Sequence, residues 1–480
     1  GSDDGLVHLS EDGGASWRNV TPKGMPEWGT VNAIELSAHD AGRAFVAVHR
    51  YRLGDSRPYI FRTDDTGASW RLLTDGGNGI PSGHFVRVVR EDPERRGLLY
   101  AGTEYGMYVS FDDGAHWQPL QLNLPVTPIT DLAVKRGDLV VATQGRSYWI
   151  LDDLQALHQL ADGSPANEPR LLAPRPAARW LDRSGAGGRG PLGRNPPYGA
   201  VIHYLLPEAL EGKDAPELRL EILDAAGEVL RSLSSTKPER QAPSPWRRFF
   251  PELVEPPLLD ARAGANRYVW PLTLADAGLV EDAVLWGWPG GPLVPPGSYQ
   301  ARLSLGEWSD TVSFEVVADP RLEVPQEAIE AQFALARDIW RELTRTHDAI
   351  RRVRDLRGQV EAVAARSEDE TVKSTAGEIA KALTGVEERL TQVKNESSQD
   401  VLNFTPQVDN QLLNLQSVVE SGLGVPNPSS HEFFAELRSE LDGLVAELDD
   451  VVAERVPELE RLLATSGAPR LSVKPAEAAD

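Results

Sequence analysis

Ser110-Phe111-Asp112-Asp113-Gly114-Ala115-His116-Trp117 is the stretch that decides the fold, because its pattern occurs three times in the first third of the chain. The pattern is Ser/Thr-x-Asp-x-Gly-x-x-Trp, and it also runs from Ser10 to Trp17 and from Thr63 to Trp70. A degenerate fourth copy, without the Gly and the Trp, ends in Asp152-Asp153. Spacings of about 40–50 residues between copies are typical of a repeated unit of four short strands.

The segments between the copies support this prediction. Short apolar or alternating runs, such as Ala44 to Val48 and Leu98 to Ala101, are separated by turn residues such as Arg136-Gly137-Asp138. Each run is too short for a helix and has the length of a strand. The first third of the chain is therefore predicted to be a partial β-propeller, numbered 1–160.

The residues of the repeat have an expected structural role. The Asp carboxylate can accept backbone N–H bonds within a hairpin turn, Gly can adopt positive φ, the Ser or Thr hydroxyl can tie the strand end to the turn, and Trp can pack beneath it. A role for the carboxylates as catalytic acids or calcium ligands is the alternative, although calcium loops need more carboxylates in a short stretch. The residues concerned are Ser10, Asp12, Gly14, Trp17, Thr63, Asp65, Gly67, Trp70, Ser110, Asp112, Gly114 and Trp117.

This repeat resembles the Asp-box, or BNR repeat, of sialidases, of some xyloglucan-degrading hydrolases and of sortilin-like propellers. Tyr51-Arg52-Leu53, Gly145 to Asp153 and Asn195 to Ala200 look like the C-terminal half of large exported bacterial propeller proteins. The resemblance implies an exported protein, periplasmic or extracellular, and it carries over no catalytic residue. About three blades fit before residue 160, whereas closed propellers take about four to eight, so we expect a C-terminal portion of a longer protein whose remaining blades are partners.

The rest of the chain is expected to be mainly β and then α. Residues 161–199 are rich in Pro and Gly and indicate a linker or strap. Residues 200–320 contain about six or seven strand-like segments, interrupted by a Pro-rich insertion at 236–262, and favour an immunoglobulin-like β-sandwich. In residues 321–466 apolar residues recur with helical spacing, which predicts four helices arranged as an antiparallel bundle or as paired helical hairpins. Residues 467–480 are expected to form a disordered tail.

Details of the helical region are also predicted. The first helix runs from Gln326 to about Arg366, and His347 on its apolar stripe is expected to be a half-buried packing residue. Ser429 or Ser430 is expected to cap the fourth helix, and Pro457 to kink it. Residues 322–466 hold 28 Asp and Glu against 15 Lys and Arg, which indicates a solvated acidic surface.

Composition excludes several classes of function. The 72 Asp and Glu outnumber the 49 Lys and Arg, and a net charge of −23 disfavours nucleic acid as a partner. There is no cysteine, so cysteine nucleophiles and Cys-ligated zinc are excluded. No transmembrane run is expected. The nine scattered His residues indicate no metal, and no nucleotide-binding or hydrolase motif indicates a cofactor.

The candidate ligand-binding residues lie between predicted strands: Arg50, Arg52, Glu104, Gln144 and Arg146. Glu104 is the best single candidate for a catalytic acid, near the start of an expected inner strand. A sialidase uses an arginine cluster with a Tyr nucleophile, and Arg50, Tyr51, Arg52 and Arg57 are residues of these types between two predicted strands. The leading hypothesis is a binding or scaffolding role toward a peptide or glycan, and the alternative is a glycoside hydrolase with carboxylates on further blades; a helical domain that docks another subunit is a third hypothesis.

Overall fold

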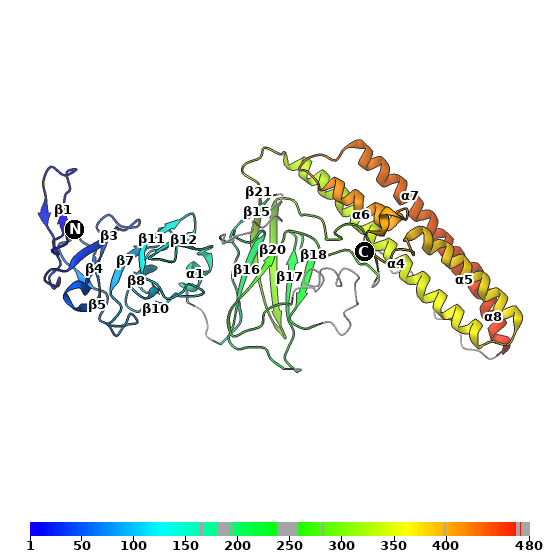
Figure 1. The fold of residues 1–480 in the computed structure, drawn as a ribbon, viewed down its shortest axis with the longest axis horizontal. Helices are drawn as coiled ribbons and strands as arrows, with labels where there is room; N and C mark the ends of the chain where they lie inside the picture. Colours follow the sequence, from blue (N-terminus) through cyan, green and yellow to red (C-terminus); the bar gives the residue numbers. More distant parts are fainter. Residues whose placement is uncertain are drawn as a thin grey trace. The chain divides into compact units, whose positions relative to one another are not determined.

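The computed structural model describes residues 1–163, 167–180, 193, 195–212, 214–237, 258–280, 283–397, 399–466 and 471. The chain divides into two compact units, Gly1–Glu168 and Pro169–Asp480 (Figure 1). Small antiparallel sheets make up the first unit, and sheets and helices make up the second. The expected tail at 467–480 lies almost wholly outside the described residues, as do the centres of the linker and of the Pro-rich insertion. The boundaries of the five segments predicted from the sequence stay a prediction.

The sheets of the first unit are meanders, in which each strand pairs with the next along the chain. The strands are β1 (His8–Leu9) and β2 (Arg18–Asn19); β3 (Thr30–Leu36), β4 (Ala44–Arg50), β5 (Asp55–Thr63) and β6 (Arg71–Leu72); β7 (Val86–Glu91), β8 (Leu99–Thr103), β9 (Gly106–Ser110) and β10 (Gln118–Pro119); and β11 (Ile129–Lys135), β12 (Asp138–Thr143) and β13 (Tyr148–Leu151). In place of a fourth strand, the last sheet is followed by the short helix α1 (Gln155–Leu160).

Successive sheets pack face to face around buried cores. One core lies between the β3–β6 and β7–β10 sheets and includes Phe45, Ile60 and Leu99. The next lies between the β7–β10 and β11–β13 sheets and includes Tyr100 and Leu132. The first strands of the sheets lie side by side, since the Arg90 guanidinium on β7 donates to the Leu132 carbonyl on β11 (2.8 Å).

The repeated motif closes the same turn in each of its three copies. Thr63 Oγ1 donates to Asp65 Oδ1 (2.8 Å) and accepts from the Gly67 N–H (2.9 Å). The Asp65 carboxylate accepts from the backbone N–H and the hydroxyl of Ser69 (2.8 and 2.6 Å). The same bonds occur in the copies with Ser10, Asp12, Gly14 and Ser16, and with Ser110, Asp112, Gly114 and His116. The repeat carboxylates are therefore engaged by their own turns.

The tryptophan of the repeat bonds to the preceding sheet. Trp70 Nε1 donates to the Val20 carbonyl just after β2 (2.7 Å), and Trp117 Nε1 donates to the Leu73 carbonyl just after β6 (3.3 Å). Trp17 differs, because its residue is 64 % exposed.

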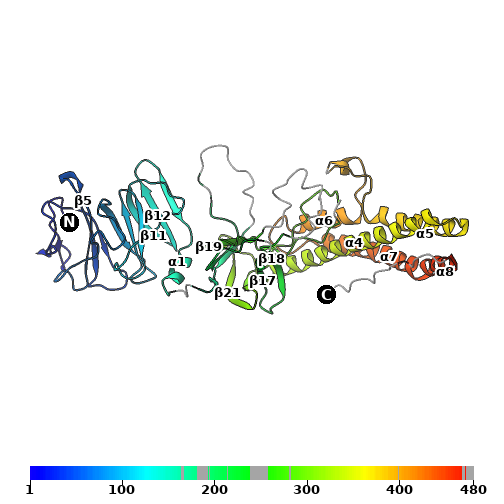
Figure 2. The same ribbon diagram turned by 90° about the horizontal axis from the view of Figure 1, so that it is seen from below.

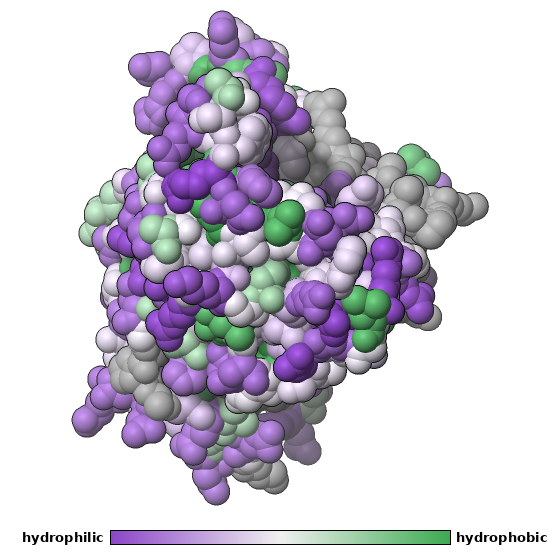
Figure 3. Space-filling model, turned by 90° about the vertical axis from the view of Figure 1, so that its left-hand side faces the viewer, coloured by the Kyte–Doolittle hydropathy of each residue, from purple (hydrophilic) through white to green (hydrophobic). Residues whose placement is uncertain are grey.

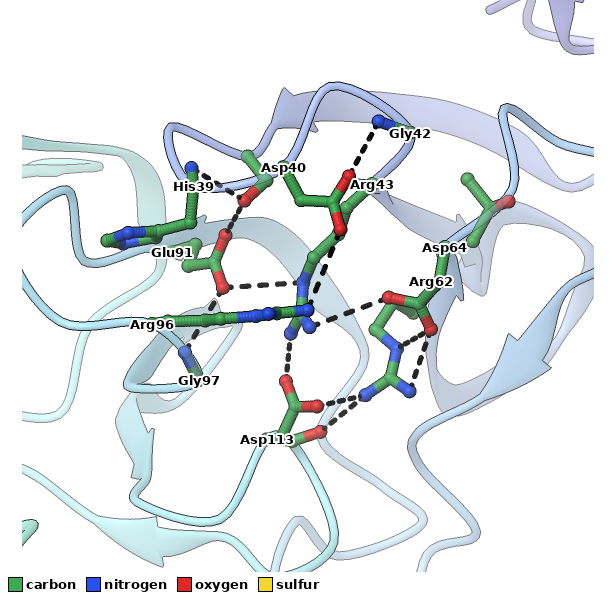
Figure 4. Close-up of polar contacts among 12 residues, drawn as sticks. His39, Asp40, Gly42, Arg43, Arg62, Asp64, Glu91, Arg96, Gly97 and Asp113 are labelled. Atoms are coloured by element: carbon green, nitrogen blue, oxygen red, sulfur yellow. Dashed lines mark hydrogen bonds and ion pairs between the residues drawn. The ribbon is translucent and has the colours of Figure 1, made fainter.

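A buried ion-pair network also joins two sheets (Figure 4). The Arg43 side chain is only 2 % exposed and contacts Glu91 (3.3 Å), Asp64 (3.5 Å) and Asp113. Arg62 contacts the same Asp113 carboxylate from β5. Glu91 and Asp113 lie in or beside the β7–β10 sheet, whereas the two arginines belong to its neighbour. The network therefore connects the two sheets at the end opposite to the turn that follows β4.

The second unit begins with two sheets around one core. The three-stranded sheet contains β14 (Arg170–Leu171), β16 (Ala200–Leu206) and β19 (Gly264–Trp270). The five-stranded sheet contains β15 (Ala177–Arg179), β21 (Trp308–Ala318), β20 (Gly297–Leu305), β17 (Leu218–Leu223) and β18 (Val229–Ser234). Tyr204 and Trp270 from one sheet share a buried cluster with Leu220 and Phe314 from the other.

The helices follow: α4 (Gln326–Arg366), α5 (Glu370–Leu390), α6 (Val408–Val419), α7 (Pro428–Asp450) and α8 (Val456–Ser466). The long helices run alongside one another (Figure 2). The predicted serine cap of α7 is wrong, because Asn427 Oδ1 accepts the Ser430 N–H (2.8 Å) and the serines lie inside the first turn. A π-helical turn at Val451–Arg455 precedes Pro457, whose missing N–H cannot continue the α-helical bonding. None of the described helices is long and apolar enough to cross a membrane.

His347 on α4 is fully buried, not half-buried as predicted. Its Nδ1 accepts the Val280 N–H (3.3 Å), and its Nε2 lies 4.0 Å from Oδ2 of Asp409 on α6. Burial raises the pKa of Asp409 to about 7. The helical core thus contains an ionisable pair that the periodic apolar pattern does not reveal.

Candidate functional site

The predicted ligand-binding residues lie at one end of the sheets of the first unit. Arg50 ends β4 and Arg52 lies in the 3₁₀ turn Tyr51–Leu53, whereas Glu104 lies between β8 and β9. Gln144 and Arg146 lie between β12 and β13. Because alternate turns of a meander fall at the same end, the three turns share one end of the packed sheets. Glu104 itself occupies a turn and lies two residues before the start of β9 (Gly106–Ser110).

A recurrent β-bulge shapes this end. The pairing register shifts between Val31 and Ala33 in β3, between Val86 and Val88 in β7, and between Ile129 and Asp131 in β11. The skipped residues are Asn32, Arg87 and Thr130. A bulge redirects the side chain of its extra residue, so the same position in each first strand supplies a polar side chain here.

Aromatic side chains form the centre of the site. The Tyr51 and Phe85 rings are stacked with centroids 4.4 Å apart and planes 8° from parallel. The His49 ring meets the Tyr51 ring edge-on at 5.0 Å. The Arg87 guanidinium lies 5.2 Å from the Phe85 centroid and 5.7 Å from that of Tyr51, and Arg52 approaches Tyr51 at 5.7 Å. This arrangement has the geometry of cation–π contacts.

The Glu104 carboxylate is engaged by Arg87. Both Nε and Nη2 of Arg87 donate to Glu104 Oε2, at 2.9 and 2.6 Å. The Asn32 amide in turn donates to the Arg87 carbonyl, and His49 Nε2 lies 3.2 Å from Asn32 Oδ1. Burial, and then the charge of Arg87, lowers the pKa of His49. The imidazole is therefore neutral at pH 7 and leaves the Arg87 charge to balance Glu104.

A second aromatic group flanks this centre. The Tyr108 hydroxyl lies 2.8 Å from His84 Nδ1, and the His84 ring lies 4.6 Å from the Tyr105 ring. Burial lowers the pKa of His84, so this ring is also neutral at pH 7. Tyr105 is 49 % exposed. It therefore presents an accessible aromatic face next to Glu104.

Two of the arginines have structural partners. Arg50 Nε donates to the Glu27 carbonyl (2.7 Å). Arg57 donates to Asp55 through Nε and Nη2 (2.9 and 2.8 Å), and the Tyr59 hydroxyl donates to the same carboxylate (2.8 Å). These bonds hold the pKa of Asp55 well below its ordinary value, with Arg57 as the main cause. Arg50 and Arg57 thus fix the β4–β5 hairpin.

The remaining candidates are accessible. Arg52, Gln144 and Arg146 are exposed. Arg52 is placed by its own neighbour, because its Nε donates to the Tyr51 hydroxyl (3.3 Å). Among the described residues, no contact joins Gln144 or Arg146 to Arg87 or to the stacked rings of Tyr51 and Phe85. The described residues contain no group of three His, Asp or Glu side chains that could hold a metal ion.

His49, Phe85 and Arg87 belong to the site but are not among the residues predicted from the sequence. A signal for Arg87 was present, because Val86-Arg87-Val88-Val89 and Val31-Asn32-Ala33-Ile34 each place one polar residue within an apolar run. In both runs this polar residue is the one at the bulge. His49 and Phe85 have no such signal, since each occurs in an apolar stretch that reads as core.

Comparisons with known proteins show distant structural similarity. No family model matches the chain, and no curated protein matches it. The GH74 enzyme of Niastella koreensis shares 13 % identity over 49 % of this chain, with a TM-score of 0.27, and an ancestral GH74 enzyme shares 14 % over 51 %, with a TM-score of 0.24. The extracellular domain of the one component system BT4673 from B. thetaiotaomicron shares 11 % over 61 %, with a TM-score of 0.19. The matches cover 34 %, 33 % and 37 % of those structures, so this chain spans about a third of their length.

Proposed function

We propose that this protein binds a glycan or a peptide at the end of its first unit that carries the β4–β5, β8–β9 and β12–β13 turns. The observation that carries the proposal is the pairing of Glu104 with Arg87, which occupies the carboxylate singled out for catalysis. A hydrolase of the usual two-carboxylate type needs a protonated acid and a second carboxylate across the substrate. The site instead presents aromatic faces, guanidinium groups and amides, which suit stacking and hydrogen bonding to a ligand.

The proposal extends to the type of protein. The Asp-box repeats favour an exported, sortilin-like protein of the BNR β-propeller type, in which further blades complete the ring of sheets. The two sheets of the second unit favour an immunoglobulin-like sandwich, and its helices an antiparallel bundle. These statements rest on the sequence resemblance and on the repeated sheet architecture.

The test is a glycan-array and peptide-library screen with the full chain, followed by titration of the best ligand. Tyr51→Ala removes one half of the stacked pair, and we expect about a tenfold loss of affinity, the size that a central aromatic contact carries. Arg96→Ala is the matched control, because Arg96 is an exposed arginine in the turn between β7 and β8, at the opposite end of the sheets. Equal affinity of both variants would contradict the assignment of the site.

Glu104→Gln separates binding from catalysis. The amide oxygen of Gln can still accept from Arg87, so we expect ligand affinity to change by less than about threefold. We also expect any polysaccharide-degrading activity to stay unchanged. A fall in turnover by orders of magnitude with intact binding would instead identify Glu104 as a catalytic acid and favour the glycoside hydrolase alternative.

A further inference from the structure

Two tryptophans of the second unit lie at the surface next to each other in the sequence. Trp286 and Trp288 are separated by one glycine, and they are 46 % and 53 % exposed. On the face of the first unit that Figure 3 shows, hydrophobic side chains are set singly among hydrophilic ones, and such residues need no explanation. Tryptophan is among the side chains with the largest apolar area, so two half-exposed indoles in one short segment leave an apolar surface that a ligand can cover.

The backbone that carries these tryptophans is held against α6. Oδ1 of Asn410 on α6 accepts the Trp286 N–H (2.9 Å), and Nδ2 of Asn410 donates to the Trp286 carbonyl (3.0 Å). The Asn410 residue is only 2 % exposed. Further along the segment, the Gln416 amide donates to the Gly290 carbonyl (2.9 Å). Because the segment is bonded to one helix at both ends, its backbone is ordered before a ligand binds, which lowers the entropy cost of binding.

Two glycines allow the segment to follow this path. Gly287 has a φ of +132°, and a Cβ atom at this residue would lie 3.1 Å from the Leu413 side chain on α6. At Gly290, a Cβ atom would lie 2.4 Å from Nε1 of Trp288. The Trp288 indole therefore lies against the backbone of Gly290, which supports the ring from one side while about half of the residue stays open to solvent.

The surroundings of the two indoles are uncharged. Residues 283–294 contain no Asp, Glu, Lys or Arg, and α6 contains only Asp409, which is 1 % exposed. In the whole chain, by contrast, 25 % of the residues are charged. Asn414 and Ser417 are exposed, and they lie four and seven residues after Asn410, which places them on the same face of α6. The polar groups beside the tryptophans are therefore an amide and a hydroxyl.

This combination of groups fits a neutral sugar. A sugar ring has apolar C–H faces that can stack on an indole, and the hydroxyl groups at its edge can bond to amide and hydroxyl side chains. Arginine is enriched at the centre of interfaces between proteins, and neither residues 283–294 nor α6 contains an arginine. The lack of charge thus favours a sugar over a second protein as the ligand.

We propose that Trp286 and Trp288 form a second ligand site, which binds a neutral oligosaccharide. The indoles stack on the C–H faces of the sugar rings, and Asn414 and Ser417 bond to the sugar hydroxyl groups. The site shares no residue with the site around Tyr51 in the first unit, so this proposal stands apart from the proposed function.

The test begins with calorimetric titration of the full chain with neutral hexasaccharides of glucose, mannose, xylose and galactose. We expect at least one of them to bind with a dissociation constant below about 1 mM. A hexamer of galacturonic acid has the same length but a carboxylate on every ring. We expect it to bind at least about tenfold more weakly, because the chain has a net charge of −23 and the site offers no counter-charge. Failure of all the neutral hexasaccharides to bind, or equal binding of the anionic one, overturns the proposal.

Variants of the segment then locate the binding. Trp288→Ala removes one stacking face, and we expect about a tenfold loss of affinity for the best hexasaccharide. Gly290→Ala keeps both indoles but places a methyl group where the Trp288 ring lies, so it should weaken binding as well. Trp17→Ala is the matched control, because Trp17 is a 64 % exposed tryptophan of the first unit, and it should bind as the unaltered chain does.

Three results would overturn the assignment. The first is a Trp288→Ala variant that binds the hexasaccharide as tightly as the unaltered chain. The second is a loss of binding in Tyr51→Ala but not in Trp288→Ala, which would assign the sugar to the site in the first unit. The third is dimerisation of the chain without any sugar that Trp288→Ala abolishes in analytical ultracentrifugation, which would make a second copy of the chain the occupant.

Discussion

Replacing Arg43 by Met should destabilise the first unit by about 3 kcal/mol. The Arg43 side chain is 2 % exposed and the Glu91 side chain 1 % exposed, so their contact at 3.3 Å lies out of water. Breaking a buried pair by removing one partner costs about 3–5 kcal/mol, because the remaining charge is left without compensation. We expect the lower value of this range for Arg43→Met, because the Gly97 N–H still donates to the Glu91 carboxylate (3.1 Å). Asp64 and Asp113 are 47 % and 37 % exposed, and each adds at most about 1 kcal/mol.

Urea unfolding of the full chain measures this loss, with near-ultraviolet circular dichroism to follow the aromatic cores of the sheets. The double variant Arg43→Met/Glu91→Gln removes the stranded charge, so we expect it to be about 1–2 kcal/mol more stable than the single variant. Arg96→Met is the control, because Arg96 is 57 % exposed and contacts Asp40 at 3.7 Å, and it should change stability by less than about 0.5 kcal/mol. Additive losses in the double variant would refute the argument that an uncompensated buried carboxylate causes the effect.

Two further predictions concern the helical core and the repeat. The pKa of Asp409 is raised from its ordinary value of 3.8 to about 7 by burial, so the folded chain holds a proton between those values that the unfolded chain releases. Stability should therefore fall as pH rises from about 4 to 7, by up to about 4 kcal/mol, and Asp409→Asn should flatten this slope in urea unfolding followed by helical circular dichroism; an unchanged slope would contradict it. Trp70→Phe should cost about 1 kcal/mol, since it removes the bond to the Val20 carbonyl (2.7 Å), whereas Trp17→Phe should leave the melting temperature nearly unchanged because Trp17 is 64 % exposed. Equal losses in the two tryptophan variants would show that the interface bond is not the cause.

Local patterns predicted most of the secondary structure. The region predicted to hold strands from residue 200 onward begins with β16 (Ala200–Leu206), and the helix predicted from Gln326 to about Arg366 forms α4. In these segments one periodic face is buried along its whole length, so periodicity and structure have the same cause. The cap of α7 was mispredicted because Asn427, Ser429 and Ser430 are all good caps, and only the path of the chain into the helix selects among them.

Contacts between side chains that are far apart in the sequence could not be predicted from local patterns. Arg43 and Asp113 are 70 residues apart, and their contact depends on the stagger between two sheets, which no spacing within one sheet determines. His347 was misjudged for the same reason, because its burial depends on the segment at Val280 that covers α4.

The candidate site shows how one such pairing changes a functional inference. Glu104, Gln144 and Arg146 were predicted to lie between strands, and the meander does bring their turns to the same end of the sheets. The sequence could not show that Arg87 on β7 reaches the Glu104 carboxylate, because Arg87 lies at a bulge that shifts the pairing register between Val86 and Val88. The sequence does not reveal whether a carboxylate such as Glu104 has an ion-pair partner, although its function depends on this. A free carboxylate is available to a substrate, whereas the paired group positions a guanidinium beside the aromatic rings.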